Sequence, residues 1–136
     1  MIVADTNIIV HLFVESGSSS LARLVLLRDP YWTSPILWKS EFRNALVKCL
    51  RSGVLQRDKA FKIMTAAETL LSGHEYHVAS GDVLDLAAGM GCSAYDAEYV
   101  VLARGTHVPL VTTDKELIEL FPETAVTPER FLAGGG

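Results

Sequence analysis

The sequence lacks the features of membrane, exported and zinc-binding proteins. No apolar run among its 136 residues reaches the roughly 18 residues that a membrane-spanning helix needs. The first residues, MIVADTN, contain no basic stretch, so we expect no signal peptide. Its four histidines form no HxxxH or HxH pair, which argues against a zinc site. We therefore expect a cytoplasmic protein with no membrane association.

Cysteine is also scarce, which excludes a disulfide framework. Cys49 and Cys92 sit in apolar helical patterns without CxxC spacing, and we interpret them as buried free thiols in a reducing compartment. A chain of 136 residues that is 49% hydrophobic and 21% charged is typical of one globular domain. We predict a single domain over 1–133 and a flexible tail at 134–136, which reads GlyGlyGly.

The net charge of −4 is distributed unevenly along the chain. Between residues 23 and 62 lie nine Lys/Arg and three acids, a net charge of +6. The rest of the chain has three Lys/Arg and thirteen acids, a net charge of −10. The basic segment is either a surface that meets phosphates or a set of solvated helix faces, and composition alone does not decide between them.

The apolar pattern alternates short runs with longer helical stretches. Strand-like runs occur at 2–4, 74–78, 108–112 and 124–126. Helical spacing occurs at 6–15, 18–28, 36–52, 57–72, 81–89, 94–104 and 114–120. Because no hairpin signal separates the strands, we expect them to pair in parallel. This predicts a three-layer α/β/α domain with a central parallel sheet flanked by helices, and a ligand site beyond the carboxyl ends of the strands.

Two acids follow predicted strands and would reach such a site. Asp5 comes directly after IVA, and Asp114 comes after VPLVTT. Taken singly, each is explained by helix capping: Asp5 as an N-cap, and Asp114 as a first-turn acid in a helix that Thr113 caps with Glu116 as its capping-box partner.

Two further acids lie within predicted helices. Glu41 projects from the edge of an apolar stripe, where exposure to solvent is an equally good explanation. Asp96 lies in SAYDAEYVVLA, a helix that is apolar on nearly every side, so we expect Asp96 to be buried and its charge to need compensation. A capping box with Ser93 is the alternative, for which Asp is a weaker fit than Glu. Glu98 points about 200° away from Asp96 and stays a secondary candidate.

The four acids together point to a metal site. Several ionised carboxylates converge in one cleft only if cations neutralise them. Oxygen ligands without His or Cys favour Mg²⁺ or Mn²⁺ over zinc. We therefore predict a metal-binding, catalytic quartet formed by Asp5, Glu41, Asp96 and Asp114.

At these residues the chain resembles the PIN-domain family, and within it the VapC-type toxins of toxin–antitoxin pairs. The matching segments are IVADTNIIV, SEFRNAL around Glu41, SAYDAEYVVLA around Asp96 and PLVTTDKEL ending at Asp114. The resemblance implies a Mg²⁺- or Mn²⁺-dependent endoribonuclease with an RNA substrate, a homodimer and a cognate antitoxin. The acidic quartet matches residue by residue, and Asn7 and Thr112 match supporting polar positions.

The roles that follow from this resemblance are expectations. Asp5 and Asp96 would bind metal directly, whereas Glu41 and Asp114 would act through water or complete a second position. The RNA backbone would be held by basic residues of the helix that carries Glu41: Lys39, Arg43, Lys48 and Arg51.

Three alternatives stay open. A PIN nuclease can serve in RNA maturation without a toxin role. A second alternative is a Mg²⁺-dependent aspartyl phosphotransferase or phosphatase. One type of such enzyme needs a second Asp at position 7, where this chain has Asn7. The other type needs a pair of acids near the start of the chain, which here has only Asp5. A catalytically silent binding module would use all four acids as caps.

Overall fold

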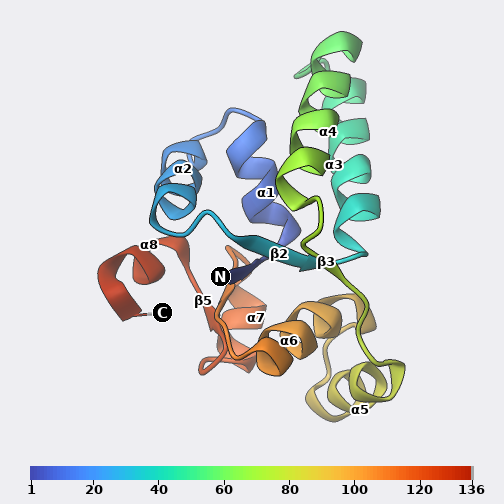
Figure 1. Ribbon diagram of the computed structural model, residues 1–136. Coiled ribbons are helices and arrows are strands. Elements are labelled where there is room, and N and C mark those ends of the chain that lie inside the picture. The colour runs from blue at the N-terminus through green and yellow to red at the C-terminus, as the bar shows by residue number, and fades with distance from the viewer. Residues whose placement is uncertain (136) are drawn as a thin grey trace.

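A computed structural model describes residues 1–135 and shows a five-stranded parallel sheet between two layers of helices (Figure 1). The sheet order is β3-β2-β1-β4-β5, and every neighbouring pair of strands is parallel. The strands are β1 (Ile2–Ala4), β2 (Trp32–Pro35), β3 (Glu75–Tyr76), β4 (Leu110–Val111) and β5 (Ala125–Val126). The predicted three-layer α/β fold is confirmed.

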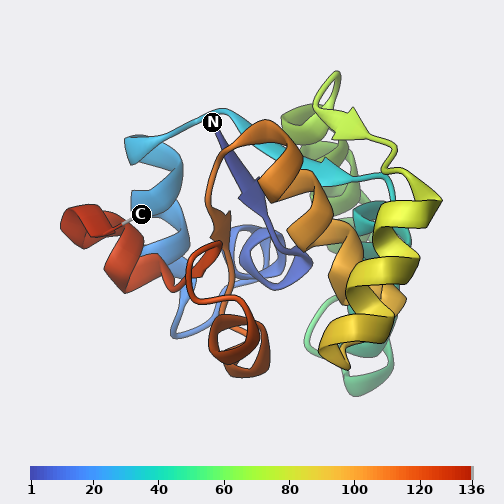
Figure 2. The same cartoon turned by 90° about the horizontal axis from the view of Figure 1, so that it is seen from below.

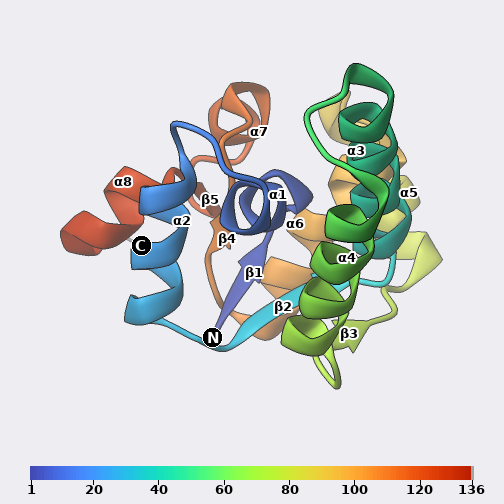
Figure 3. The ribbon, with the colours of Figure 1, turned by 90° about the horizontal axis from the view of Figure 1, so that it is seen from above.

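Helices cover both faces of the sheet (Figures 1 and 3). The helices of one layer are α1 (Thr6–Phe13), α2 (Ser19–Arg28), α3 (Trp38–Ser52) and α4 (Arg57–Leu71). Those of the other are α5 (Ser80–Met90), α6 (Ala94–Thr106) and α7 (Lys115–Leu120), with α5 and α6 side by side (Figure 2). The chain then forms α8 (Pro128–Arg130) and a last helical turn, η1 (Phe131–Gly135), both of which contact α2.

The strands β1 and β4 each supply side chains to two hydrophobic cores. Ile2 and Ala4 of β1 pack in the core under α1–α4, whereas Val3 packs in the core with α6 and α7. In β4, Val111 packs in the core under α1–α4 and Leu110 packs in the core with α6 and α7. Successive strand side chains point to opposite faces, so a strand covered on both faces reads as an unbroken apolar run. That is why IVA predicted a strand without alternation.

Strand β2 is absent from the predicted order of elements. Its residues, WTSP, are all buried, although two are hydroxyl residues and one is proline. The hydroxyls are satisfied by β1, since Thr33 Oγ1 donates to the Ile2 carbonyl at 2.8 Å and Ser34 Oγ to the Ala4 carbonyl at 2.6 Å. Such polar residues are typical of loops. Their partners are some thirty residues away in the chain, so no local pattern identifies this strand.

The structure bears on several local expectations, two of which need correction. The helix α3 ends at Gly53, with φ 80°, as predicted, but α7 is capped by Asp114 and not by Thr113. Cys49 and Cys92 are free thiols, yet both are half-buried and not buried. No helix within residues 1–135 combines the length and apolarity needed to cross a bilayer. The predicted flexible tail begins within η1, and its last residue, 136, lies outside the described residues.

Candidate active site

The carboxyl ends of β1 and β4 bring the first two candidate segments together. Ala4 is in register with Val111, so the residues that follow them, Asp5 and Thr112, are neighbours. The Asp5 amide donates to the Val111 carbonyl at 3.1 Å, and Thr112 Oγ1 donates to Asp5 Oδ2 at 2.7 Å. Parallel pairing thus places Asp5 at the sheet edge where ligand sites of α/β proteins lie.

Both oxygens of the Asp5 carboxylate are held by donors. Oδ1 accepts from the Thr6 amide at 2.7 Å, and Oδ2 accepts from Thr112 and from Asn7 Nδ2, the latter at 3.2 Å. Asn7 is itself fixed, because its Oδ1 accepts from the Thr113 amide at 3.2 Å. The two supporting residues expected from the sequence, Asn7 and Thr112, therefore both contact Asp5.

The Asp5 carboxyl is buried, with 8% of the residue exposed. Burial raises the pKa of Asp5 from its ordinary 3.8 to about 6, and repulsion from Glu41 and Asp96 adds to this. The hydrogen bonds from Thr112 and Thr6 act in the opposite direction. A carboxyl in this setting is costly to ionise, which is typical of functional acids.

Asp114 has a capping role and also borders the site. Its Oδ1 accepts from the Glu116 and Leu117 amides at 2.9 and 3.4 Å, so it is the N-cap of α7. Its own amide donates to Thr112 Oγ1 at 3.0 Å. Thr112 Oγ1 is therefore a shared contact that links Asp114 to Asp5.

Glu41, on α3, reaches the site through a network of hydroxyls. Its Oε1 accepts from Tyr99 OH at 2.5 Å and from Thr6 Oγ1 at 2.9 Å. Burial, together with the neighbouring Glu41 carboxylate, raises the pKa of Tyr99 above its ordinary value, which favours the protonated phenol as donor. The exposed-edge explanation of Glu41 does not hold, because its carboxylate points toward α1 and α6.

Asp96 is half-buried and not buried, in contrast to the sequence expectation. The helix α6 leaves one side open to solvent, where Tyr95 is 63% exposed. Ser93 caps α6 by accepting from the Asp96 amide at 3.0 Å. Burial raises the pKa of Asp96, and repulsion from Asp114 and Glu41 raises it further.

Charge effects connect the four acids in pairs. Glu41 and Asp96 both act on Asp5, and Asp114 acts on Asp96. Glu98, on the other side of α6, is also within reach of Glu41, which raises its pKa after the larger effect of burial. Within residues 1–135, no three His, Cys, Asp or Glu side chains stand close enough to form a ready-made metal cage.

The donor set nevertheless fits a hard divalent cation. All four quartet side chains offer oxygen only, and their repulsion is what a cation would relieve. Among residues 1–135, Glu41 Oε2 and Asp114 Oδ2 accept no hydrogen bond, so both are available to a ligand. A phosphotransferase is not favoured by the sequence, since position 7, where it would need a second acid, is Asn7.

Two of the four candidate RNA-binding residues share the Glu41 side of α3. Lys48 lies about 20° from Glu41 around the helix and Arg51 about 80°. Both are exposed, and neither forms an ion pair within the described chain. They lie about two and three turns along α3 from Glu41, with their charges available to a ligand that follows this side of the helix.

The other two candidates, Lys39 and Arg43, lie about 160° from Glu41 around α3. Lys39 Nζ is 3.6 Å from Glu68 and 3.9 Å from Glu75. Arg43 lines a groove of about 360 Å³ between α3 and α4. The structure thus separates the predicted basic set into two sides of one helix.

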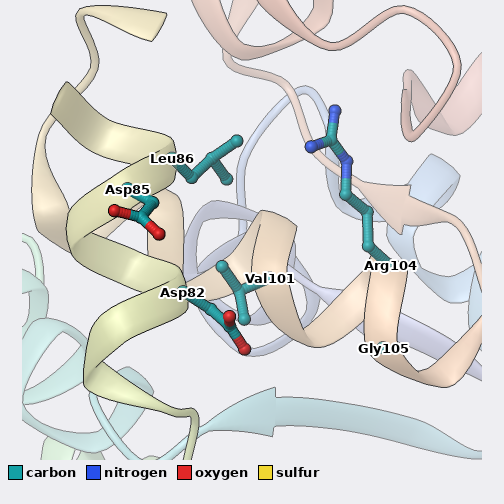
Figure 4. Close-up of a pocket in the computed structure, with 6 residues that line it drawn as sticks. All are labelled: Asp82, Asp85, Leu86, Val101, Arg104 and Gly105. Carbon is teal, nitrogen blue, oxygen red and sulfur yellow. The ribbon is translucent and has the colours of Figure 1, made fainter. Parts of the chain in front are cut away.

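A larger depression, of about 530 Å³, lies between α5 and α6, away from the quartet. Asp82 and Asp85 on α5 and Val101 and Arg104 on α6 line it, and Figure 4 shows the Asp82 carboxylate beside Val101, with the Arg104 side chain extending away from both carboxylates. The Arg104 guanidinium is 5.3 Å from the Phe121 ring centre, with which it forms a cation–π contact. None of the four candidate acids lines this depression.

Comparison with known proteins identifies the family. No protein-family model matches the chain. Ribonuclease VapC3 of Pyrobaculum aerophilum is 32% identical over 130 residues, which cover 93% of this chain and 98% of the relative. The chain belongs to the VapC family of PIN-domain ribonucleases. The resemblance inferred from the sequence is confirmed.

Solved structures agree with a VapC-type fold. PAE2754 from Pyrobaculum aerophilum matches with a TM-score of 0.75 at 21% identity, over 97% of this chain and 86% of that one. A toxin–antitoxin complex from Klebsiella pneumoniae matches with a TM-score of 0.69 at 16% identity, over 94% and 98%. FitAcB from Neisseria gonorrhoeae matches with a TM-score of 0.69 at 15% identity, over 95% and 99%.

Sequence reasoning missed two polar residues of this VapC-family site, Thr6 and Tyr99. Thr6 stands next to Asp5, which accounted for that segment on its own. Tyr99 lies in an otherwise apolar helix, where the pattern predicts a core residue. One signal was present, because a buried tyrosine hydroxyl needs a hydrogen-bond partner. Tyr99 lies three residues after Asp96 and hence on the same side of α6.

Proposed function

We propose that this VapC-family protein is a metal-dependent endoribonuclease that hydrolyses RNA phosphodiester bonds as the toxin of a type II toxin–antitoxin pair. The observation that supports the proposal is that the buried Asp5 is under the charges of Glu41 and Asp96, and that Asp114 acts on Asp96 and shares the Thr112 hydroxyl with Asp5. Three donors hold Asp5, and the carboxylates of Glu41 and Asp96 are close enough to raise its pKa. Family membership supplies the reaction type.

Asp5 and Asp96 are proposed to hold Mg²⁺ or Mn²⁺ directly, with Glu41 and Asp114 acting through water or at a second position. Such an ion supplies an activated water and stabilises the charge on the leaving oxygen. The chain's own contribution is orientation, since Asn7 and Thr112 fix the Asp5 carboxylate.

The RNA backbone is proposed to lie along the Glu41 side of α3. Lys48 and Arg51 are placed to hold its phosphates, whereas Lys39 and Arg43 point to the far side of that helix. Contacts of this kind give affinity without sequence preference. The acidic remainder of the chain limits non-specific binding, so substrate shape would contribute to recognition.

A cognate antitoxin, a homodimer and a cytoplasmic location complete the proposal. One matched structure is a toxin–antitoxin complex from Klebsiella pneumoniae, one chain of which has the same fold. A ribonuclease of this kind needs restraint in its host, which favours an inhibiting partner. A role in RNA maturation without a toxin function is the second candidate within the same family.

The test is cleavage of a structured RNA pool with Mg²⁺ or Mn²⁺ against EDTA, using wild type and Asp96→Asn. Asp58→Asn is the matched control, because its side chain is 90% exposed on α4. We expect cleavage by wild type and by the control only with metal, and none by Asp96→Asn at an unchanged melting temperature. Cleavage by Asp96→Asn, or cleavage in EDTA, would refute the proposed site.

The toxin role is tested by expression in a host that lacks the partner. Wild type is expected to arrest growth, whereas Asp96→Asn is not. Normal growth with active wild-type enzyme would instead favour RNA maturation. No cleavage by folded wild type, together with no binding of Mn²⁺ in calorimetry, would support a silent binding module.

A further inference from the structure

Two buried hydroxyls meet the Glu41 carboxylate at a single oxygen. Tyr99 OH lies 2.5 Å from Glu41 Oε1, and Thr6 Oγ1 lies 2.9 Å from the same atom. The hydroxyls are 2.6 Å from each other, which closes a triangle. Tyr99 is 1% exposed and Thr6 8%. The three residues come from α6, α1 and α3, so the triangle joins helices from both layers of the fold.

The number of protons determines how many of the two hydroxyls donate to Glu41. Each hydroxyl carries one proton, so an ionised Glu41 leaves two protons for three contacts. Whichever pair of contacts forms, at least one hydroxyl donates to Oε1. Oε2 accepts no hydrogen bond from residues 1–135. One oxygen is therefore anchored, and the other is open to a ligand.

We propose that Tyr99 and Thr6 are positioning residues that hold Oε1 of Glu41 and so present Oε2 to the metal or the RNA. The inference rests on the proposed function of the quartet. A glutamate has several rotatable bonds, and a half-buried one on a helix edge would otherwise sample several rotamers. A donor on one oxygen, supported by the contact between the two hydroxyls, selects a single arrangement, as the partners of ligating carboxylates do in metal sites.

Thr6 has a second role that strengthens this assignment. Its amide donates to Asp5 Oδ1 at 2.7 Å while its hydroxyl reaches Glu41. One residue therefore links the carboxylate at the end of β1 to the carboxylate on α3. The distance between these two acids is set by the first turn of α1 and not by the flexible side chain of Glu41.

The test compares Tyr99→Phe with Tyr95→Phe. Tyr95 lies on the same helix, is 63% exposed, and makes no hydrogen bond through its hydroxyl within the described residues, so it is a matched control. Three quantities are measured: the Mn²⁺ dissociation constant by calorimetry, kcat and KM for RNA cleavage, and the melting temperature. We expect Tyr99→Phe to weaken Mn²⁺ binding or lower kcat by about tenfold or more, with KM little changed. Tyr95→Phe should match wild type.

Thr6 supplies a second pair of variants. Thr6→Val removes the hydroxyl at nearly constant volume and should weaken Mn²⁺ binding, whereas Thr6→Ser should restore it. In a Glu41→Gln background, Tyr99→Phe should cause no further loss of Mn²⁺ affinity. An equal loss in that background would overturn the proposal, because the hydroxyl would then act through something other than Glu41.

The outcomes separate this inference from the function on which it rests. Wild type that neither binds Mn²⁺ nor cuts RNA refutes both. Wild type that does both, with Tyr99→Phe and Thr6→Val indistinguishable from wild type, refutes only the positioning role. A lower melting temperature with unchanged Mn²⁺ affinity and unchanged kcat also refutes it, since the hydroxyls would then serve stability alone.

Discussion

Replacing Asp5 by Asn is expected to make the metal-free protein more stable at neutral pH while abolishing its activity. The reason is the buried carboxyl, whose pKa is raised from 3.8 to about 6. Between these two pH values the folded state keeps a proton that the unfolded chain has released. The free energy of unfolding therefore decreases as the pH rises through this window, and the full decrease is present above pH 6.

The cost follows from the two pKa values. A rise from 3.8 to about 6 corresponds to about 3 kcal/mol at pH 7.5, and to about 1 kcal/mol at pH 4.5. Asn at position 5 removes this electrostatic cost. It also lowers the free energy of unfolding by about 1 kcal/mol, because its amide group cannot accept from both the Thr6 amide and Thr112. The net gain is about 2 kcal/mol at pH 7.5 and about zero at pH 4.5.

The assay is thermal and chemical denaturation in EDTA at both pH values. For 136 residues, a gain of about 2 kcal/mol corresponds to a rise of roughly 7 °C in melting temperature. Asp58→Asn, on an exposed side chain, is the control and should show no such pH-dependent gain. Adding Mn²⁺ should then stabilise wild type and the control, but not Asp5→Asn.

Two results would refute this reasoning. If Asp5→Asn is no more stable than wild type at pH 7.5, the carboxylate is not under the electrostatic cost that its burial implies. If the gain is the same at pH 4.5 and pH 7.5, it does not come from ionisation. A stabilised but inactive variant would instead show the exchange of stability for function that is common at active sites.

Two further predictions concern the contacts around the quartet. Thr112→Val removes the hydroxyl shared by Asp5 and Asp114. It should lower the free energy of unfolding, measured with urea, by about 1–3 kcal/mol and the rate of RNA cleavage by roughly 10–100-fold. Thr112→Ser should retain both stability and cleavage, and its failure to do so would contradict the role of the hydroxyl. Lys48→Gln should lower the salt dependence of RNA binding by a slope of about 0.7, measured in EDTA. Lys39→Gln should leave that slope unchanged, because Lys39 is paired with Glu68 and Glu75; equal effects would mean that the two sides of α3 are not distinguished by RNA.

The sequence by itself determined the fold class and the candidate acids. Apolar runs of different length separated strands from helices, and Asp5 after IVA pointed to the sheet edge because parallel strands end on one side. Gly53 predicted the end of α3, which its positive φ bears out. These features follow from local spacing and backbone preference, which a chain carries in its own order of residues.

Tertiary structure alone decided the features that depend on distant partners. Strand β2 is polar, and it pairs with β1 and β3 while the carbonyls of β1 accept from its buried hydroxyls. Lys39 and Lys48 look alike in sequence, and only the helix orientation separates them. The convergence of Thr6 and Tyr99 on Glu41 joins three helices. Hydrogen bonds and charge repulsion act over a few ångströms in space, whatever the separation along the chain, so no local pattern could reveal them.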